Sequence, residues 1–273
     1  METRWTLKSK SKISTKKLES ELGINSVLVE LLHQRGIETF EEAKDFFRPT
    51  YDQTHNPFLM KDMDKAVERI FMAFEKNERI LVYGDYDVDG TTAVSLMFTF
   101  LQKTHAEIEY YIPNRYTEGY GISYQGIDYA NENGFDLIIA LDCGIKAFDK
   151  IEYANERNID FIICDHHRPG DKIPNAVAVL DPKREDCNYP YKELCGCGVG
   201  YKLVEAIAQK KNIPFEELEE YHDLLAISIG ADIVPITGEN RTLAYYGLKR
   251  VNSKPRPGIA ELLKLSNKFT SKR

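Results

Sequence analysis

Apolar positions in the middle of the chain form short continuous runs, and each run is followed by a stretch with apolar residues at helical spacing. Such runs, separated by helices, are typical of parallel strands that are buried on both faces of a sheet. Right-handed crossovers between them produce a doubly wound α/β fold with a mainly parallel sheet. The predicted strands are 80–83, 108–112, 137–141, 161–164 and 177–180, and the predicted helices between them are 92–103, 124–133 and 148–157.

Helical patterns lie on both sides of this region. Apolar residues recur at helical spacing over 18–47, where Gly36 is expected to separate two short helices. An amphipathic helix is expected over 62–77. After the last strand, further helices are expected at 201–211, 215–229 and 241–251.

The composition is that of a globular protein, with 273 residues, 42% of them hydrophobic, and a formal net charge of −7. The chain has no apolar run long enough for a membrane span and no signal-peptide pattern, so we expect a cytoplasmic protein without a membrane partner. The acidic total argues against a protein that coats nucleic acid nonspecifically. The five cysteines are expected to be reduced thiols, and the spacing of Cys195 and Cys197 does not favour a zinc site.

Carboxylates and imidazoles follow three of the predicted strands, and one more carboxylate follows a predicted helix. They are Asp85, Asp87, Asp89, Asp142, Asp165, His166, His167 and Asp232. Because the carboxyl ends of parallel strands meet at one edge of a sheet, we expect the groups that follow strands to lie close together. Like charges at such distances repel strongly unless cations lie between them. The arrangement therefore predicts a metal site.

Each aspartate also has a simpler interpretation, because a single Asp after a strand is often a helix N-cap or a turn residue. Three aspartates at alternate positions are harder to explain in this way, since one cap serves one helix. The same pattern resembles an EF-hand calcium loop, but that loop needs a Glu at its twelfth position and a helix before it. Here Leu96 is at the twelfth position and a predicted strand precedes the loop.

Oxygen-rich ligands with one or two imidazoles favour Mn²⁺ or Mg²⁺ over zinc. Two such ions about 3.5–4 Å apart are the arrangement used for phosphoester hydrolysis. The tandem His166 and His167 fit a divided role, in which one ring binds metal and the other faces phosphate as a donor or general acid. A hydrogen-bonded pair of core histidines is the weaker alternative.

Two further segments are candidates for phosphate binding. The glycine-rich segment 196–200 lacks the final glycine of a dinucleotide loop, so it is better explained by close packing at the start of a helix. Arg115 follows the second predicted strand at the same edge of the sheet, and its guanidinium suits phosphate oxygens. An ordinary surface arginine is an equally good interpretation.

Taken in order, four motifs resemble those of the DHH phosphoesterase superfamily, in the form found in RecJ-type exonucleases, which degrade single-stranded DNA in the 5′→3′ direction. The motifs lie at 83–90, 141–144, 165–167 and 230–241, and segments 32–37, 112–115 and 256–258 are also similar. Other DHH relatives begin the first motif with a His, where this chain has Tyr83. That difference favours the RecJ type.

The resemblance implies a two-metal site that holds Mn²⁺ or Mg²⁺. The first ion is expected near Asp85, Asp87 and Asp142. The second is expected near Asp89, Asp142, His166 and Asp232, with Asp142 bridging the two ions. His167 and Asp165 are the expected catalytic residues, with His167 facing the scissile phosphate, and Arg115 is the expected substrate contact.

The resemblance also implies a domain organisation and a function. We expect a tail and helical extension over 1–77, a DHH catalytic domain over 78–253 and, over 254–273, the start of a connection to further domains. A DHH-associated domain and an oligonucleotide-binding fold follow in RecJ proteins, so the chain is expected to be the catalytic part of a longer protein, and a monomer. The implied activity is exonuclease action on single-stranded DNA in repair and recombination. The alternatives are a phosphodiesterase for short oligonucleotides and a non-catalytic replication or repair scaffold.

Overall fold

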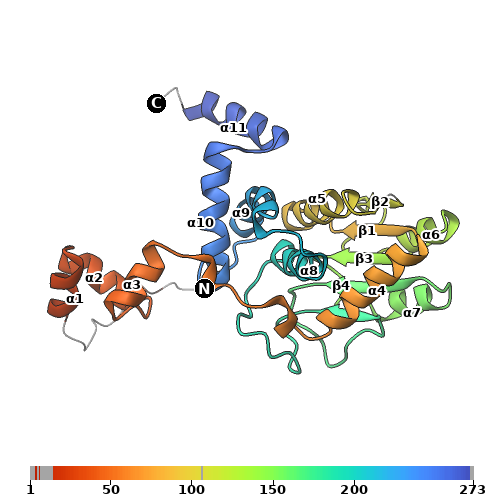
Figure 1. The fold of residues 1–273 in the computed structure, drawn as a ribbon, viewed down its shortest axis with the longest axis horizontal. Coiled ribbons are helices and arrows are strands. Elements are labelled where there is room, and N and C mark those ends of the chain that lie inside the picture. Colours follow the sequence, from red (N-terminus) through yellow and green to blue (C-terminus); the bar gives the residue numbers. More distant parts are fainter. Residues whose placement is uncertain (1–3, 5, 7–14, 106, 271–273) are drawn as a thin grey trace. The chain divides into compact units, whose positions relative to one another are not determined.

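Five parallel strands form the central sheet of the computed structural model (Figure 1). They are β1 (Ile80–Gly84), β2 (Ile108–Tyr111), β3 (Leu137–Leu141), β4 (Asp160–Cys164) and β5 (Ala178–Leu180), in the order β2-β1-β3-β4-β5. The prediction of a doubly wound parallel sheet is therefore confirmed. The chain passes from β1 to β2 on one side and then crosses back to β3 on the other side of β1. The carboxyl ends of β1 and β3 therefore flank a topological switch point, where such sheets bind ligands.

Helices cover both faces of the sheet, as continuous apolar strands require. On one face, Ile80 and Val82 join a core with α4 (Met63–Lys76), α5 (Val88–Gln102) and α8 (Gly196–Lys211). On the other face, Leu81 and Tyr83 join a second core with α6 (Tyr124–Glu132) and α7 (Phe148–Asn155). The alternation of side chains along each strand thus fills two separate cores.

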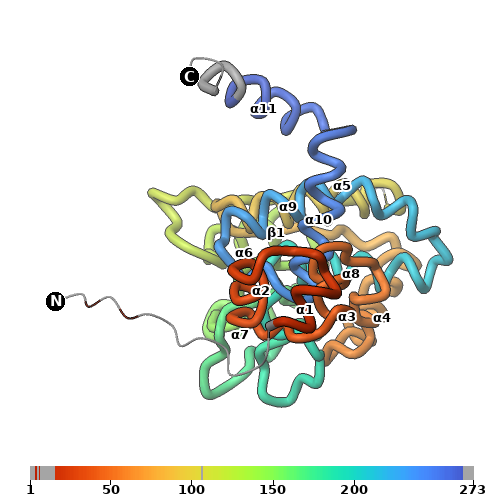
Figure 2. Tube along the Cα trace, turned by 90° about the vertical axis from the view of Figure 1, so that its left-hand side faces the viewer, coloured from red at the N-terminus to blue at the C-terminus, as the bar shows by residue number. Residues whose placement is uncertain are grey.

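The chain after β5 is helical, with one departure from the prediction. Helices α9 (His222–Ala231), α10 (Gly238–Ser253) and α11 (Pro257–Thr270) follow α8, and α10 leads into α11 at the end of the described chain (Figures 1 and 2). The expectation of one helix over 215–229 is wrong in its first half, where two short 3₁₀ turns, η3 (Phe215–Glu217) and η4 (Glu219–Tyr221), take its place. Leu218 and Tyr221 are both buried, and their spacing of three residues suits a 3₁₀ turn.

The structure describes residues 4, 6, 15–105 and 107–270, and these divide into two compact units, 1–53 and 54–273. Most of the predicted N-terminal tail lies outside the described residues. Three short helices follow, α1 (Thr15–Leu22), α2 (Ser26–His33) and α3 (Phe40–Phe47), where the pattern predicted two. The extra break arises at Gly23, which has a positive φ of 64°, and at Asn25, whose side chain caps α2.

The unit that contains the sheet begins before the first strand. The short 3₁₀ turns η1 (Tyr51–Gln53) and η2 (Pro57–Leu59) lie on either side of the division between the units, and α4 packs on the sheet. The domain boundary expected between residues 77 and 78 stays a prediction. All five cysteines are free and buried, which confirms the prediction of reduced thiols. Among the described residues, no helix combines the length and apolar character needed to cross a membrane.

The buried His222 makes the fold sensitive to acid. Its side chain Nε2 lies 2.8 Å from the hydroxyl of Tyr201, and burial, followed by the positive charge of Arg250, lowers the pKa of His222 to about 4. Because the unfolded chain keeps a pKa near 6.5, it binds more protons than the folded chain between about pH 6.5 and pH 4. The contribution of His222 to stability is therefore present above this window and is lost as pH falls through it.

We predict that His222→Gln makes stability less dependent on pH in this window. We expect denaturant titrations at pH 7, 5.5 and 4.5 to show that the free energy of unfolding falls with pH in both proteins. The fall should be up to about 3 kcal/mol larger in wild type than in the variant. Other titrating carboxyl groups are common to both proteins, so they cancel in the difference. Parallel losses in the two proteins would contradict the prediction.

Candidate metal centre

Four aspartates stand side by side at the carboxyl edge of the sheet. The register aligns the last residues of four strands, which are Gly84, Leu141, Cys164 and Leu180. The residue that follows each of them is an aspartate: Asp85, Asp142, Asp165 and Asp181. Three of these were predicted from their position after a strand. The same rule applied to the predicted strand 177–180 would have found the fourth.

The loop after β1 carries two aspartates with different tasks. Asp85 is buried, and its Oδ1 accepts a hydrogen bond of 3.2 Å from the N–H of Gly121, while its Oδ2 has no partner. Asp87 is the N-cap of α5, and its Oδ1 accepts a hydrogen bond of 2.9 Å from the N–H of Gly90. The capping interpretation therefore holds for Asp87. A Cβ at Gly90 would overlap the backbone of Asp85, so the loop closes this tightly only on glycine.

Asp89 is buried and is held by the N-terminus of α8. Its two carboxylate oxygens each accept a hydrogen bond of 2.7 Å, from the N–H groups of Gly196 and Cys197. The hydroxyl of Ser228 on α9 donates a further bond of 2.6 Å. A helix N-terminus favours a negative charge, so these donors stabilise the ionised carboxylate. The glycine-rich segment thus serves close packing at a helix start, as predicted.

Asp142 is a buried carboxylate with little compensation from hydrogen bonds. It is 1% exposed, and its Oδ1 has no hydrogen-bond partner. Burial, together with the charges of Asp89 and Asp87, raises the pKa of Asp142 to about 10. Its backbone has a positive φ of 59°, a conformation that Asp tolerates better than most residues. A nearby cation would remove the repulsion and favour the ionised form.

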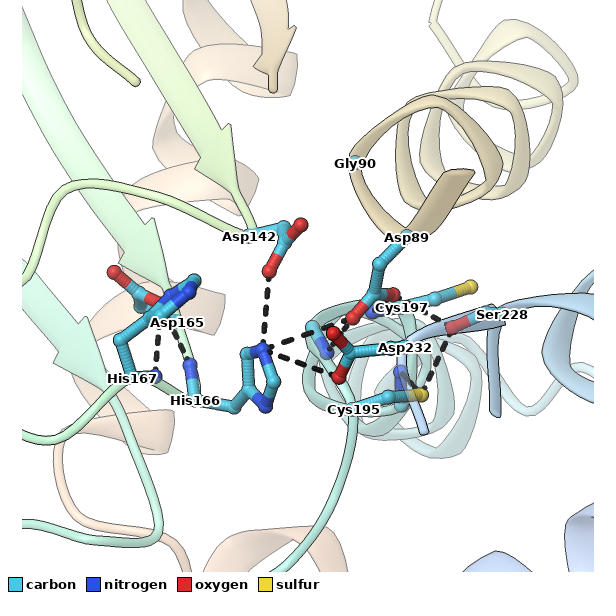
Figure 3. A network of polar contacts seen from close by, with 12 residues as sticks. Asp89, Gly90, Asp142, Asp165, His166, His167, Cys195, Cys197, Ser228 and Asp232 are labelled. Atoms are coloured by element: carbon cyan, nitrogen blue, oxygen red, sulfur yellow. Dashed lines mark hydrogen bonds and ion pairs between the residues drawn. The ribbon is translucent and has the colours of Figure 1, made fainter. Parts of the chain in front are cut away.

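The ring of His166 lies among three carboxylates (Figure 3). Its Nε2 is 3.2 Å from Oδ1 of Asp142, 3.6 Å from Oδ2 of Asp232 and 3.7 Å from Oδ2 of Asp89. These residues come from four different segments of the chain, and Asp232 immediately follows α9. Burial raises the pKa of Asp232, although the positive charge of His166 acts against the shift.

Asp165 faces into the protein and orients His167. Its carboxylate accepts hydrogen bonds from the backbone N–H of Ile145 (2.9 Å), His166 (2.7 Å) and His167 (3.1 Å). Nδ1 of His167 donates another, at 2.7 Å, so the other ring nitrogen of His167 points away and lies 3.2 Å from the hydroxyl of Tyr120. Burial would raise the pKa of Asp165, but these bonds, above all the one from His167, lower it. The same bond raises the pKa of His167.

The donor set fits a divalent cation. Two groups of three side chains could each hold a metal ion, because each side chain offers one ligand atom and the three atoms of a group lie within 4.8 Å of one another. The first group is Asp142, His166 and His167, and the second is Asp89, His166 and Asp232. Several buried atoms at the same edge have no hydrogen-bond partner: Asp85 Oδ2, Asp142 Oδ1, Asp232 Oδ2 and His166 Nε2. Buried polar atoms without partners are costly, and a cation among them would offset that cost. Carboxylate oxygens with one or two imidazoles suit Mn²⁺ or Mg²⁺.

Some of the predicted residues lie outside these two groups. Asp85 and Asp87 are at the same edge but in neither group. Arg115 is exposed, and its guanidinium carbon lies 5.2 Å from the centre of the Tyr86 ring. Its role as a phosphate contact therefore stays a prediction.

Sequence reasoning missed several groups that shape the site. Asp181 is fully buried, and its Oδ2 has no hydrogen-bond partner. Ser228 and the N–H groups of α8 hold Asp89 across more than a hundred residues of sequence, and no local pattern signals such a contact. Tyr120 lies between two glycines in the loop that follows Arg115, and no residue type in that loop by itself indicates a contact with His167.

Comparisons with known proteins agree on one family. The profile described as "DHH family, N-terminal domain" matches residues 79–229. A protein from Bacillus subtilis (strain 168) named "Single-stranded-DNA-specific exonuclease RecJ" is 41% identical over 263 residues, which cover 96% of this chain and 33% of that protein. A protein of the same name from Escherichia coli (strain K12) is 36% identical over 224 residues, covering 78% of this chain and 39% of that protein.

Two solved structures are also similar. "Crystal structure of exonuclease RecJ bound to manganese" matches with a TM-score of 0.69 and 31% identity, over 76% of this chain and 52% of that one. A crystal structure of RecJ from Thermus thermophilus in complex with Mn²⁺ matches with a TM-score of 0.76 and 25% identity, over 92% of this chain and 35% of that one. The chain spans about a third of the length of the curated relatives it matches, 33% and 39% for the two above.

The contact between Gly196 and Asp142 gives a prediction. A Cβ at Gly196 would lie 2.5 Å from Oδ1 and 2.6 Å from Cβ of Asp142, so Gly196→Ala must displace this carboxylate. We expect the affinity for Mn²⁺, measured by calorimetry, to fall about 10–100-fold, as it does when a residue that supports a ligand is lost.

A matched control is Gly258→Ala, because Gly258 also lies in the first turn of a helix and a Cβ there meets nothing within 4 Å. This variant should bind Mn²⁺ as wild type does. If a folded Gly196→Ala protein bound Mn²⁺ with unchanged affinity, metal binding would not depend on the position that the Asp142 carboxylate has beside Gly196.

Proposed function

The chain belongs to the DHH family, and from that premise we propose that it is the catalytic part of a metal-dependent nuclease that removes nucleotides from the 5′ end of single-stranded DNA. The observation that carries the proposal is the group of buried, unpartnered donor atoms on Asp142, His166 and Asp232, with His167 beside it. Relatives named as single-stranded-DNA-specific exonucleases support the substrate and the reaction. A role in DNA repair and recombination is part of the proposal.

Two divalent ions, Mn²⁺ or Mg²⁺, are proposed for the site, and two similar solved structures, both of RecJ with bound Mn²⁺, support this choice. The proposed ligands of one ion are Asp85, Asp87 and Asp142, and those of the other are Asp89, Asp142, His166 and Asp232. When bound, the ions supply the Lewis acidity that activates water and offsets charge on the phosphoryl oxygens. Asp89 already accepts several hydrogen bonds, but a carboxylate has about four lone-pair sites and retains room for a cation.

The proton-handling atom in this proposal is Nε2 of His167. Because the carboxylate of Asp165 accepts a hydrogen bond from Nδ1, that nitrogen carries a proton and the tautomer is fixed. Nε2 then faces the open side, where it lies next to the hydroxyl of Tyr120. When the ring is protonated, Nε2 carries the second proton and can donate it to a phosphate oxygen or to the leaving group. Asp165 acts through His167 and is a positioning residue.

Four expectations stay predictions: the domain organisation, the binding of a long strand by other domains, the monomeric state and the cytoplasmic location. We propose that the sheet-containing unit carries the chemistry and that other parts of a longer protein contribute to strand binding. The short length of the chain relative to its relatives supports this division. Arg115, exposed beside Tyr86, is the proposed phosphate contact on this unit.

The test is hydrolysis of 5′- and 3′-labelled single strands in Mn²⁺. We expect mononucleotides to be released from the 5′ end, and we expect Asp142→Asn and Asp232→Asn to lose activity by more than the roughly 10–100-fold seen when only supporting residues are removed. The control is Asp64→Asn, which makes the same change of charge at an exposed position in the first turn of α4 and should leave the rate unchanged.

Release from the 3′ end, or faster cleavage of duplex than of single strands, would contradict the proposal. Faster turnover of dinucleotides than of long strands would favour the short-oligonucleotide phosphodiesterase. Calorimetry separates the remaining alternative, because a non-catalytic scaffold would bind no Mn²⁺ in either the wild type or the Asp142→Asn variant.

A further inference from the structure

A cavity of about 300 Å³ lies next to His167, the proposed catalytic residue. Tyr120 and His167 line one part of it, and Ile145, Lys146 and Lys150 line another. This volume is at the lower end of the range for pockets that hold small ligands, about 300–1,000 Å³. The cavity therefore has room for one small ligand beside the proposed reaction centre.

Two cations border this cavity and have no counter-charge among the described residues. Neither Lys146 nor Lys150 forms an ion pair with any residue that the structure describes. Lys150 only approaches the ring of Tyr124, at 6.0 Å from its centre. In a chain with a formal net charge of −7, two unpaired ammonium groups beside an acidic centre are suited to an anionic ligand. A phosphate of the substrate backbone is such a ligand.

An aromatic ring at the cavity is held in place but remains accessible. Tyr120 is 53% exposed, and its hydroxyl lies 3.2 Å from Nε2 of His167. The ring of Tyr86 meets it edge-to-face at 6.0 Å, and the guanidinium of Arg115 lies over Tyr86. Exposed aromatic rings together with cations are the combination on which single-stranded nucleic acids bind, because each unpaired base has a face that can stack.

We propose that this cavity is a nucleotide subsite, in which a base stacks on Tyr120 and an adjoining phosphate contacts Lys146 and Lys150. The inference rests on the proposed nuclease function and extends it. Because Tyr120 contacts His167, a nucleotide seated here would place a neighbouring phosphodiester at the proposed metal centre. Only a base that is out of a duplex can stack on the ring, so the subsite would contribute to selection of single strands within this unit itself.

The first test is strand binding by the double variant Lys146→Gln/Lys150→Gln. The probe is a fluorescein-labelled ten-nucleotide thymidine strand with phosphorothioate linkages, which resist hydrolysis, titrated by anisotropy in Mn²⁺ at several salt concentrations. We expect affinity to fall about tenfold and the salt slope, log K against log [salt], to become shallower by about 1.4, as the loss of two phosphate contacts on a single strand implies.

The matched control is Lys210→Gln/Lys211→Gln, which makes the same change of charge at the C-terminal end of α8, about 24 Å from the end that holds Asp89. It should bind the strand like wild type. The conservative pair Lys146→Arg/Lys150→Arg should restore binding, because it keeps both charges. If the two Gln double variants lost the same amount of strand affinity, the effect would come from net charge alone, and the subsite would be overturned.

The second test concerns stacking. Tyr120→Phe keeps the ring and should bind the strand within about twofold of wild type, whereas Tyr120→Leu should bind about tenfold more weakly. Equal binding by the Leu and Phe variants would overturn the stacking role.

Hydrolysis of bis(4-nitrophenyl) phosphate, a small diester that needs only the metal centre, separates this inference from the proposed function. The control variant Lys210→Gln/Lys211→Gln should hydrolyse it at the wild-type rate. Strand binding that depends on the lysines, without hydrolysis of either substrate, would defeat the proposed function and leave the subsite standing. Strand hydrolysis that is equally efficient in wild type and lysine variants, or no strand binding by wild type, would defeat the subsite.

Discussion

The site is governed by one constraint, which is that several carboxylates lie close together at a buried sheet edge where their charges repel. Backbone N–H groups compensate some of them. The N-terminus of α8 compensates Asp89, and three N–H groups compensate Asp165. Asp142 lies between these compensated groups and lacks a partner for Oδ1, and burial with its neighbours' charges raises its pKa. A cation bound beside Asp142 would offset this concentration of negative charge.

The backbone around Asp142 follows from the same constraint. The positive φ of Asp142 turns its chain away from the strand direction, and helix α8 can approach closely only because Gly196 has no Cβ. That approach brings the N–H groups of Gly196 and Cys197 to Asp89. Glycine at position 196 is thus required by close packing against the Asp142 carboxylate, and a local explanation of helix initiation does not reveal this requirement.

Much of the sheet and part of the site could be predicted because both depend on local patterns. Continuous apolar runs located the strands, and the rule for strand ends located Asp85, Asp142 and Asp165. The sequence could not show that Asp87 caps α5, that Asp165 faces inward or that Ser228 reaches Asp89, because these assignments depend on contacts made after folding. The same limit explains the helix expected over 215–229, where burial of Leu218 and Tyr221 favours 3₁₀ turns over a regular helix.

The net charge of −7 at first argued against a nucleic-acid partner. Its distribution changes that conclusion, because aspartates concentrated at the sheet edge contribute to the excess and two divalent ions would add four positive charges there, taking −7 to −3. Lys146 and Lys150 line the same cavity as Asp165 and His167, and the ring of Tyr120 borders that cavity too. What matters to a phosphate backbone is the local potential within about 10 Å, the screening distance in salt, and not the total charge. An acidic chain is therefore compatible with a nucleic-acid substrate when its acidity is the means of holding cations.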